Sequence, residues 1–141
     1  MMMTDEILAD LADCLAAGEM AYLHKTTYEL LAHPDSRRWN DAETDYEMDR
    51  VLERVIQEPH NFVRIDPPEP PDSYRMMEEF AFTREDAQLI KRLADALQGK
   101  KPFRLFRQAA EDAGVLDDWY DFEFEQLKEW AKQELIRKWD A

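Results

Sequence analysis

Four basic side chains gather in one short stretch of the sequence, GKKPFRLFRQ at positions 99–108. They are Lys100, Lys101, Arg104 and Arg107, and they lie in a chain of 141 residues that carries 32 acidic and 18 basic side chains. Cations spaced this closely attract an anion, which could be a carboxylate, a phosphate or the acidic surface of a partner. This basic cluster is therefore the main candidate for a binding site in the sequence.

The backbone of the same stretch also favours an anion. Pro102 suits the first position of a helix, which we expect over 102–113. The residue before it, Lys101, cannot accept a hydrogen bond from the free N–H groups at the start of that helix. These groups carry partial positive charge, so an anion is favoured beside them. Two occupants stay open: an internal carboxylate, which we favour, or an external phosphate, nucleotide or acidic partner.

The segment YRMMEEF at positions 74–80 supplies the internal candidate. We expect the carboxylate of Glu78 or Glu79 to dock at the start of the 102–113 helix and to pair with a member of the basic cluster. With Arg75 beside them, these acidic residues would form a structural clasp. In that case the basic cluster would have a role in stability, and no external ligand would be required.

Other catalytic and metal-binding patterns are absent from the sequence. The three histidines, His24, His33 and His60, lack the spacing of a zinc-binding helix. Cys14 is the only cysteine, and it falls in an apolar helical register. With three glycines in all, the chain has no phosphate-binding glycine loop. We therefore expect no metal and no cofactor, and although the question of an enzyme stays open, the balance is against one.

The composition restricts the kinds of partner. The net charge of −14 disfavours phosphate backbones and anionic lipid surfaces, so nucleic-acid binding ranks last and we expect no membrane association. No apolar run approaches the ~20 residues of a membrane span. The opening MMMTDE lacks a basic leader, so we expect a cytoplasmic protein. A protein partner is possible on these grounds, and the oligomeric state stays open.

The periodicity of apolar residues predicts a mainly α fold with a small antiparallel β-hairpin or sheet (α+β), in a single compact domain. Positions 1–65 should hold a helix, a hairpin, a second helix and a short strand. Positions 66–72, DPPEPPD, contain four of the seven prolines and should form a stiff connector. Positions 73–141 should be helical. We expect the parts on either side of the connector to share one core.

Helix ends and core positions follow from local signals. Thr4, Thr44 and Thr83 are the expected caps at the starts of three helices, and Gly18 and Gly99 are the expected helix stops.

Aromatic residues at helical spacing should fill the core of the second half of the chain. We expect Phe106, Trp119 and Tyr120 to be buried there.

Three segments resemble a known family in their order and spacing. They are YRMMEEF (74–80), ALQGKKPFRLFRQ (96–108) and WYDF (119–122), and together they resemble the uncharacterised bacterial protein family 0158. The resemblance covers about positions 72–135. The matching positions are Tyr74, Arg75, Met77, Glu78, Glu79, Phe80, Gly99, Lys100, Phe103, Arg104, Phe106, Trp119, Tyr120 and Phe122. The sequence departs from the family pattern at Pro102, where a small residue is usual, and the resemblance implies no activity.

Two functions compete on this basis. The first is a small non-enzymatic interaction or regulatory protein. The missing catalytic pattern favours it, and so does the uneven charge, with 21 acidic and 8 basic residues in positions 1–90 against 11 and 10 in positions 91–141. The alternative is a small anion-binding or phosphometabolite-binding protein, or an enzyme on such a metabolite, that uses the basic cluster.

Overall fold

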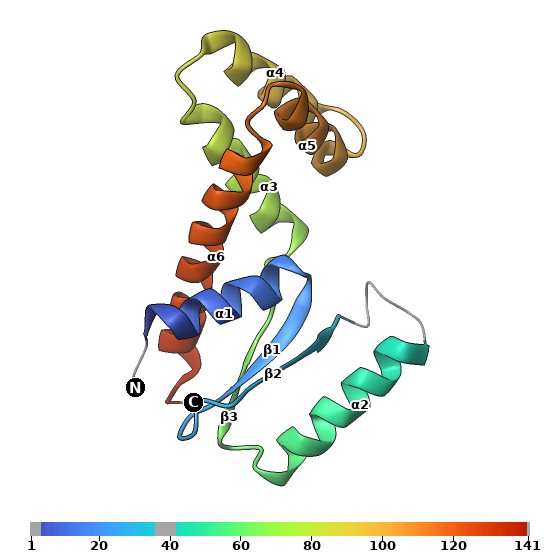
Figure 1. Ribbon diagram of the computed structural model, residues 1–141, viewed down its shortest axis with the longest axis vertical. Helices are drawn as coiled ribbons and strands as arrows, with labels where there is room; N and C mark the ends of the chain where they lie inside the picture. Colours follow the sequence, from blue (N-terminus) through green and yellow to red (C-terminus); the bar gives the residue numbers. More distant parts are fainter. Residues whose placement is uncertain (1–3, 36–41, 141) are drawn as a thin grey trace. The chain divides into compact units, whose positions relative to one another are not determined.

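The computed structural model describes residues 4–35 and 42–140 (Figure 1). These residues form a mainly helical α+β fold, as the sequence predicts. Its elements in chain order are α1 (Asp5–Ala16), β1 (Glu19–His24), β2 (Leu30–Pro34), α2 (Ala42–Gln57), β3 (Phe62–Ile65), α3 (Pro70–Phe82), α4 (Ala87–Gln98), α5 (Pro102–Asp112) and α6 (Leu116–Lys138).

The chain divides into two compact units. One, here called the sheet unit, consists of positions 1–67 and 127–141, and the other, the helical unit, consists of positions 68–126. Helix α6 contributes to both, because its residues up to Gln126 belong to the helical unit and those from Leu127 belong to the sheet unit. The expectation of one shared core stays a prediction.

A three-stranded antiparallel sheet forms the centre of the sheet unit, in the order β2-β1-β3. The predicted hairpin is confirmed, with Tyr22 opposite Leu31, and the predicted third strand joins the other edge of β1, with Tyr22 opposite Arg64. The strands therefore do form one sheet. The central strand β1 is buried from Ala21 to His24, as its position between two neighbours requires.

Side chains of α6 cover the free edge of β3 within the sheet unit. Trp130 donates from Nε1 to the backbone carbonyl of Asp66 at 2.9 Å, and Lys138 donates from Nζ to the carbonyl of Arg64 at 2.9 Å. Unpaired edge groups of a sheet invite pairing with other chains. These two bonds satisfy carbonyls at that edge and tie the end of α6 to the sheet.

An aromatic cluster forms the core of the helical unit. Phe80, Phe106 and Trp119 are fully buried, and their rings meet edge to face at centroid distances of 5.1–6.1 Å. The predictions for Phe106 and Trp119 are confirmed. The prediction for Tyr120 is wrong, because this side chain is 46% exposed. Adjacent helical residues point about 100° apart, and with Trp119 directed into the core Tyr120 points toward solvent.

Several helix ends differ from the predicted ones. The hydroxyl of Thr4 accepts from the N–H of Ile7 at 3.2 Å, so that cap is confirmed. Thr44 lies inside α2, and Thr83 ends α3, so neither begins a helix. The cap of α4 is instead Asp86, whose carboxylate accepts from two backbone N–H groups of the first turn.

The proline-rich connector is shorter than the predicted 66–72. Helix α3 begins at Pro70, so Pro70 and Pro71 are its first two residues. Proline is tolerated there because the first N–H groups of a helix have no intrahelical partner. Two of the four prolines thus start a helix.

Candidate binding groove in the helical unit

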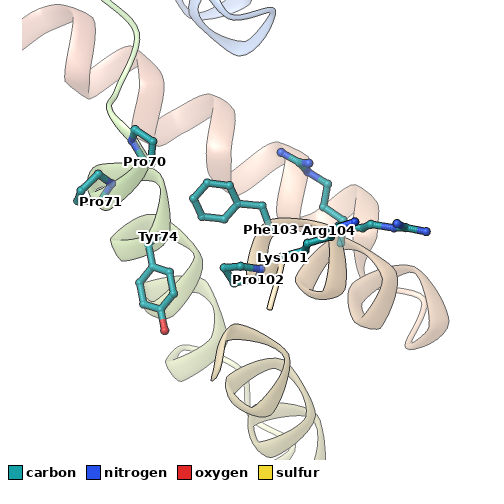
Figure 2. Close-up of a pocket in the computed structure, with 8 residues that line it drawn as sticks. Pro70, Pro71, Tyr74, Lys101, Pro102, Phe103 and Arg104 are labelled. Atoms are coloured by element: carbon teal, nitrogen blue, oxygen red, sulfur yellow. The ribbon is translucent and has the colours of Figure 1, made fainter. Parts of the chain in front are cut away.

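An apolar groove lies between the first turn of α3 and the first turn of α5 (Figure 2). Its volume is about 820 Å³. Figure 2 shows the α3 residues facing Pro102 and Phe103 of α5 across the groove. The lining residues are Pro70, Pro71 and Tyr74 of α3, with Lys101, Pro102, Phe103, Arg104 and Arg107 of the α5 segment.

The walls of this groove are held rigidly. Prolines occupy the first positions of both helices, so the backbone there has little freedom. The hydroxyl of Tyr74 donates to the backbone carbonyl of Leu97 at 3.0 Å, which fixes the ring in the α3 wall. Phe103 is half-buried and packs against the aromatic core. The groove is therefore preformed.

The rim of the groove is cationic. Lys101, Arg104 and Arg107 are exposed, and among the described residues no acidic side chain lines the groove. Burial raises the pKa of the Glu123 carboxyl, and the nearby positive charge of Arg107 partly offsets this rise. Lys101 and Arg104 have no ion pair within residues 4–35 and 42–140, and these two are the uncompensated cations of the rim.

The connection from α4 to α5 places Lys101 in an unusual conformation. Helix α4 ends at Gly99, as predicted, but Gly99 has extended dihedrals, and the left-handed residue is Lys101 with φ 54° and ψ 56°. A Cβ at position 99 would lie 3.0 Å from Cδ1 of Leu105, so a side chain there would require Leu105 to shift. No side chain caps α5, which confirms the uncapped start predicted from the sequence.

The residues of the predicted clasp lie elsewhere in the helical unit. Arg75, Glu78 and Glu79 line a second hollow, with Phe82, Thr83, Phe122 and Gln126. Arg75 pairs with Asp72 of its own helix at 3.1 Å. In the described parts of the chain, no ion pair joins Glu78 or Glu79 to the basic cluster. The structure thus brings three of the four cluster residues into one groove, without Lys100, and leaves these two carboxylates outside it.

The α3 wall of the groove was missed by the sequence interpretation. The sequence pattern predicts a connector at Pro70 and Pro71, although a proline pair is also a signal for a helix start. Tyr74 lies three to four residues further on, so it falls on the same helical face. A helix that begins at Pro70 places Pro70, Pro71 and Tyr74 on one surface.

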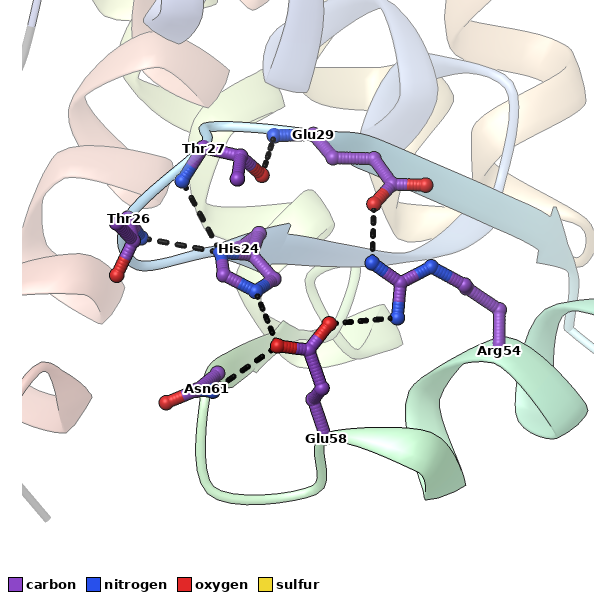
Figure 3. A network of polar contacts seen from close by, with 7 residues as sticks. All are labelled: His24, Thr26, Thr27, Glu29, Arg54, Glu58 and Asn61. Atoms are coloured by element: carbon purple, nitrogen blue, oxygen red, sulfur yellow. Dashed lines mark hydrogen bonds and ion pairs between the residues drawn. The ribbon is translucent and has the colours of Figure 1, made fainter.

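A polar network surrounds His24 in the sheet unit (Figure 3). The imidazole is 3% exposed, and its Nδ1 accepts from the N–H groups of Thr26 and Thr27, both at 3.1 Å. Nδ1 therefore carries no proton, and Nε2–H faces Oε1 of Glu58 at 3.4 Å. A histidine beside a carboxylate is typical of an acid–base pair, but here both ring nitrogens are occupied.

The same network joins α2 to the hairpin. Arg54 pairs with Glu29 at 2.8 Å and with Glu58 at 2.9 Å, and Asn61 donates to Glu58 at 3.3 Å. The hydrogen bonds from Arg54, His24 and Asn61 lower the pKa of the Glu58 carboxyl. These contacts hold the hairpin turn and the end of α2 in place.

His33 is also engaged in the fold. Its Nδ1 donates to the carbonyl of Pro34 at 2.8 Å, and its Nε2 accepts from the hydroxyl of Tyr22 at 3.1 Å. Over residues 4–35 and 42–140, no group of three histidine, cysteine or acidic side chains is arranged to hold a metal ion. None of the helices in these ranges has the length and apolar character that a bilayer crossing requires.

The fold is that of a mainly helical α+β protein with a three-stranded antiparallel sheet. The model of the uncharacterised protein family UPF0158 matches residues 39–139, and the chain belongs to this family. The resemblance found in the three sequence segments is thus confirmed, and the match begins well before them.

Sequence similarity to a curated bacterial protein agrees with this assignment. The chain is 38% identical over 88 residues to the UPF0158 protein PA5073 of Pseudomonas aeruginosa strain PAO1. The aligned region is 62% of this chain and 56% of that protein, so it spans little more than half of the relative. No solved structure matches the chain.

Proposed function

We propose that the chain is a non-enzymatic protein-interaction domain that binds its partner in the groove between α3 and α5. The observation that carries the proposal is an apolar groove with a cationic rim on a chain of net charge −14. Exposed apolar surface with a polar rim is typical of interaction sites.

The chemistry of the lining supports binding over catalysis. The groove offers apolar rings and permanent cations, and the hydroxyl of Tyr74 is already bonded to the carbonyl of Leu97. General acid–base catalysis requires a side chain that exchanges a proton near neutral pH, and histidine or a perturbed carboxyl usually supplies it. Neither residue type lines this groove among the described residues.

Site-specific photo-crosslinking in the native cells tests the proposal. A benzophenone amino acid replaces Arg107 at the groove rim in one variant and Gln88, an exposed residue of α4, in the matched control. We expect a discrete crosslinked protein from position 107 and none from position 88. The same products from both positions, or no product from position 107, would overturn the proposal.

A further inference from the structure

We infer that the partner segment is an acidic linear peptide that inserts an apolar side chain between α3 and α5 and places carboxylates on Lys101 and Arg104. This inference rests on the proposed function and specifies the chemistry of the partner.

The interior of the groove calls for an apolar anchor. Proline rings and two aromatic side chains line it, and its volume of about 820 Å³ accommodates a large aliphatic or aromatic side chain with part of its backbone. The bond from Tyr74 to Leu97 and the prolines at both helix starts fix the walls before binding. A preformed groove loses little conformational entropy when a ligand enters it.

The charge at the rim selects an acidic segment. All charged residues that line the groove are cations, and Lys101 and Arg104 have no ion pair in the described residues. A carboxylate placed beside these cations would therefore contribute to the specificity of binding. A basic segment would meet like charge at the same positions, which disfavours it.

The shape of the groove favours a peptide over a small molecule. Five of its eight lining residues are exposed, so the site is open along one side. Small-molecule sites usually enclose 70–90% of their ligand. An open groove between two helix starts instead accommodates one side chain while the neighbouring residues of a peptide run along the rim.

The conformation of Lys101 is a second observation at the rim. A left-handed conformation is unfavourable for a residue with a side chain, and such strain concentrates at functional sites. Glycine would adopt the same conformation without strain. The chain has lysine there, and this keeps a cation at the mouth of the groove.

Fluorescence anisotropy with the full chain tests the inference with three labelled 12-residue peptides. The first carries glutamates around a central Phe-Leu pair, the second has Ala-Ala in place of that pair, and the third has lysines in place of the glutamates. We expect saturable binding of the first peptide, and a dissociation constant at least about tenfold weaker for the other two.

Matched variants connect the binding to the groove. Lys101→Gly combined with Arg104→Gln removes two rim cations and relieves the strained backbone, so the fold should persist. The control, Lys91→Gln combined with Arg92→Gln, removes two exposed cations of α4. We expect the first pair to weaken binding by about tenfold or more and the control pair to change it less than about twofold.

Each outcome separates the inference from the proposed function. If the neutral or the basic peptide binds best and the groove variant abolishes that binding, the acidic partner is refuted and the interaction domain stands. If no peptide binds while a free fatty acid saturates the groove, both are refuted. Equal losses from the two variant pairs would show non-specific charge attraction and would refute the acidic partner.

Discussion

The hydroxyl of Tyr74 donates a hydrogen bond to the backbone carbonyl of Leu97 at 3.0 Å. Leu97 lies in the last turn of α4, where the backbone carbonyls have no N–H partner within the helix. One bond therefore completes the end of α4 and fixes the ring that forms the α3 wall of the groove. Stability of the helical unit and the shape of its groove depend on the same contact.

Removing the hydroxyl of Tyr74 should lower the stability of the helical unit. Tyr74→Phe leaves the carbonyl of Leu97 without its partner and should lower the free energy of unfolding by about 0.5–1.5 kcal/mol. Urea denaturation followed by far-UV circular dichroism measures the change. Tyr120→Phe is the control, because that side chain is 46% exposed, and it should have no measurable effect. Equal effects in the two variants would contradict the role given to Tyr74.

Trp119 should be the most costly single truncation in the helical unit. It is 1% exposed and contacts Phe80 and Phe106 edge to face. Trp119→Ala should therefore cost about 3–5 kcal/mol of unfolding free energy. The neighbouring Tyr120→Ala should cost less than about 1 kcal/mol, because its ring is largely exposed. Thermal or urea unfolding of the pair measures the contrast, and similar losses would contradict the assigned faces of α6.

Glu58 should make stability depend on pH in the acidic range. Its carboxyl pKa is lowered, first by Arg54 and then by His24 and Asn61, from an ordinary value of 4.5. A lowered folded-state pKa stabilises the fold above the ordinary value, and this contribution is lost as the pH falls through the folded-state pKa. The stability difference between wild type and Glu58→Gln should therefore shrink as the pH falls below 4.5.

Unfolding free energies at a series of pH values measure this difference. Glu53→Gln, at an exposed acidic position in α2, serves as the control. A difference between wild type and Glu58→Gln that stays constant from neutral pH to pH 3 would show that the network does not stabilise the ionised carboxylate.

Cys14 should react slowly with thiol reagents in the folded protein. Burial raises the pKa of its thiol to about 11, with further contributions from the nearby charges of Glu19 and Asp13. At pH 8 a free cysteine with a pKa of about 8.5 has a thiolate fraction roughly two hundred times larger. Alkylation by iodoacetamide should thus be slow when the chain is folded, rise up to about pH 11, and become fast in urea. Rapid alkylation of the folded chain at pH 8 would contradict the burial.

The secondary structure could be predicted from the sequence wherever a local signal decides it. The antiparallel hairpin followed from the alternation of apolar and polar residues along its strands. The start of α5 followed from the proline at its first helical position, Pro102. Prediction failed where two signals competed. Thr83 and Asp86 can both cap a helix, and the structure uses Asp86, since Thr83 is still part of the end of α3.

The groove could be predicted only in part. The basic cluster marked the α5 side, because charge and proline are visible along the chain. The α3 side depends on packing between segments far apart in the sequence, including the bond from Tyr74 to Leu97, which lies 23 residues further on. No local pattern encodes that pairing. The predicted clasp placed Glu78 or Glu79 at the start of α5, whereas both line a different hollow and Tyr74 lines the groove.

Amide chemical-shift mapping of the full ¹⁵N-labelled chain with the acidic Phe-Leu peptide tests the central claim most directly. We expect saturable shifts to concentrate at the non-proline residues from Asp72 to Tyr74 in α3 and from Lys101 to Arg107, around the groove lining. We also expect these shifts to be lost in the Lys101→Gly and Arg104→Gln double variant. Shifts centred on α2 or on the sheet, or no saturable shifts at all, would contradict the groove as the binding surface.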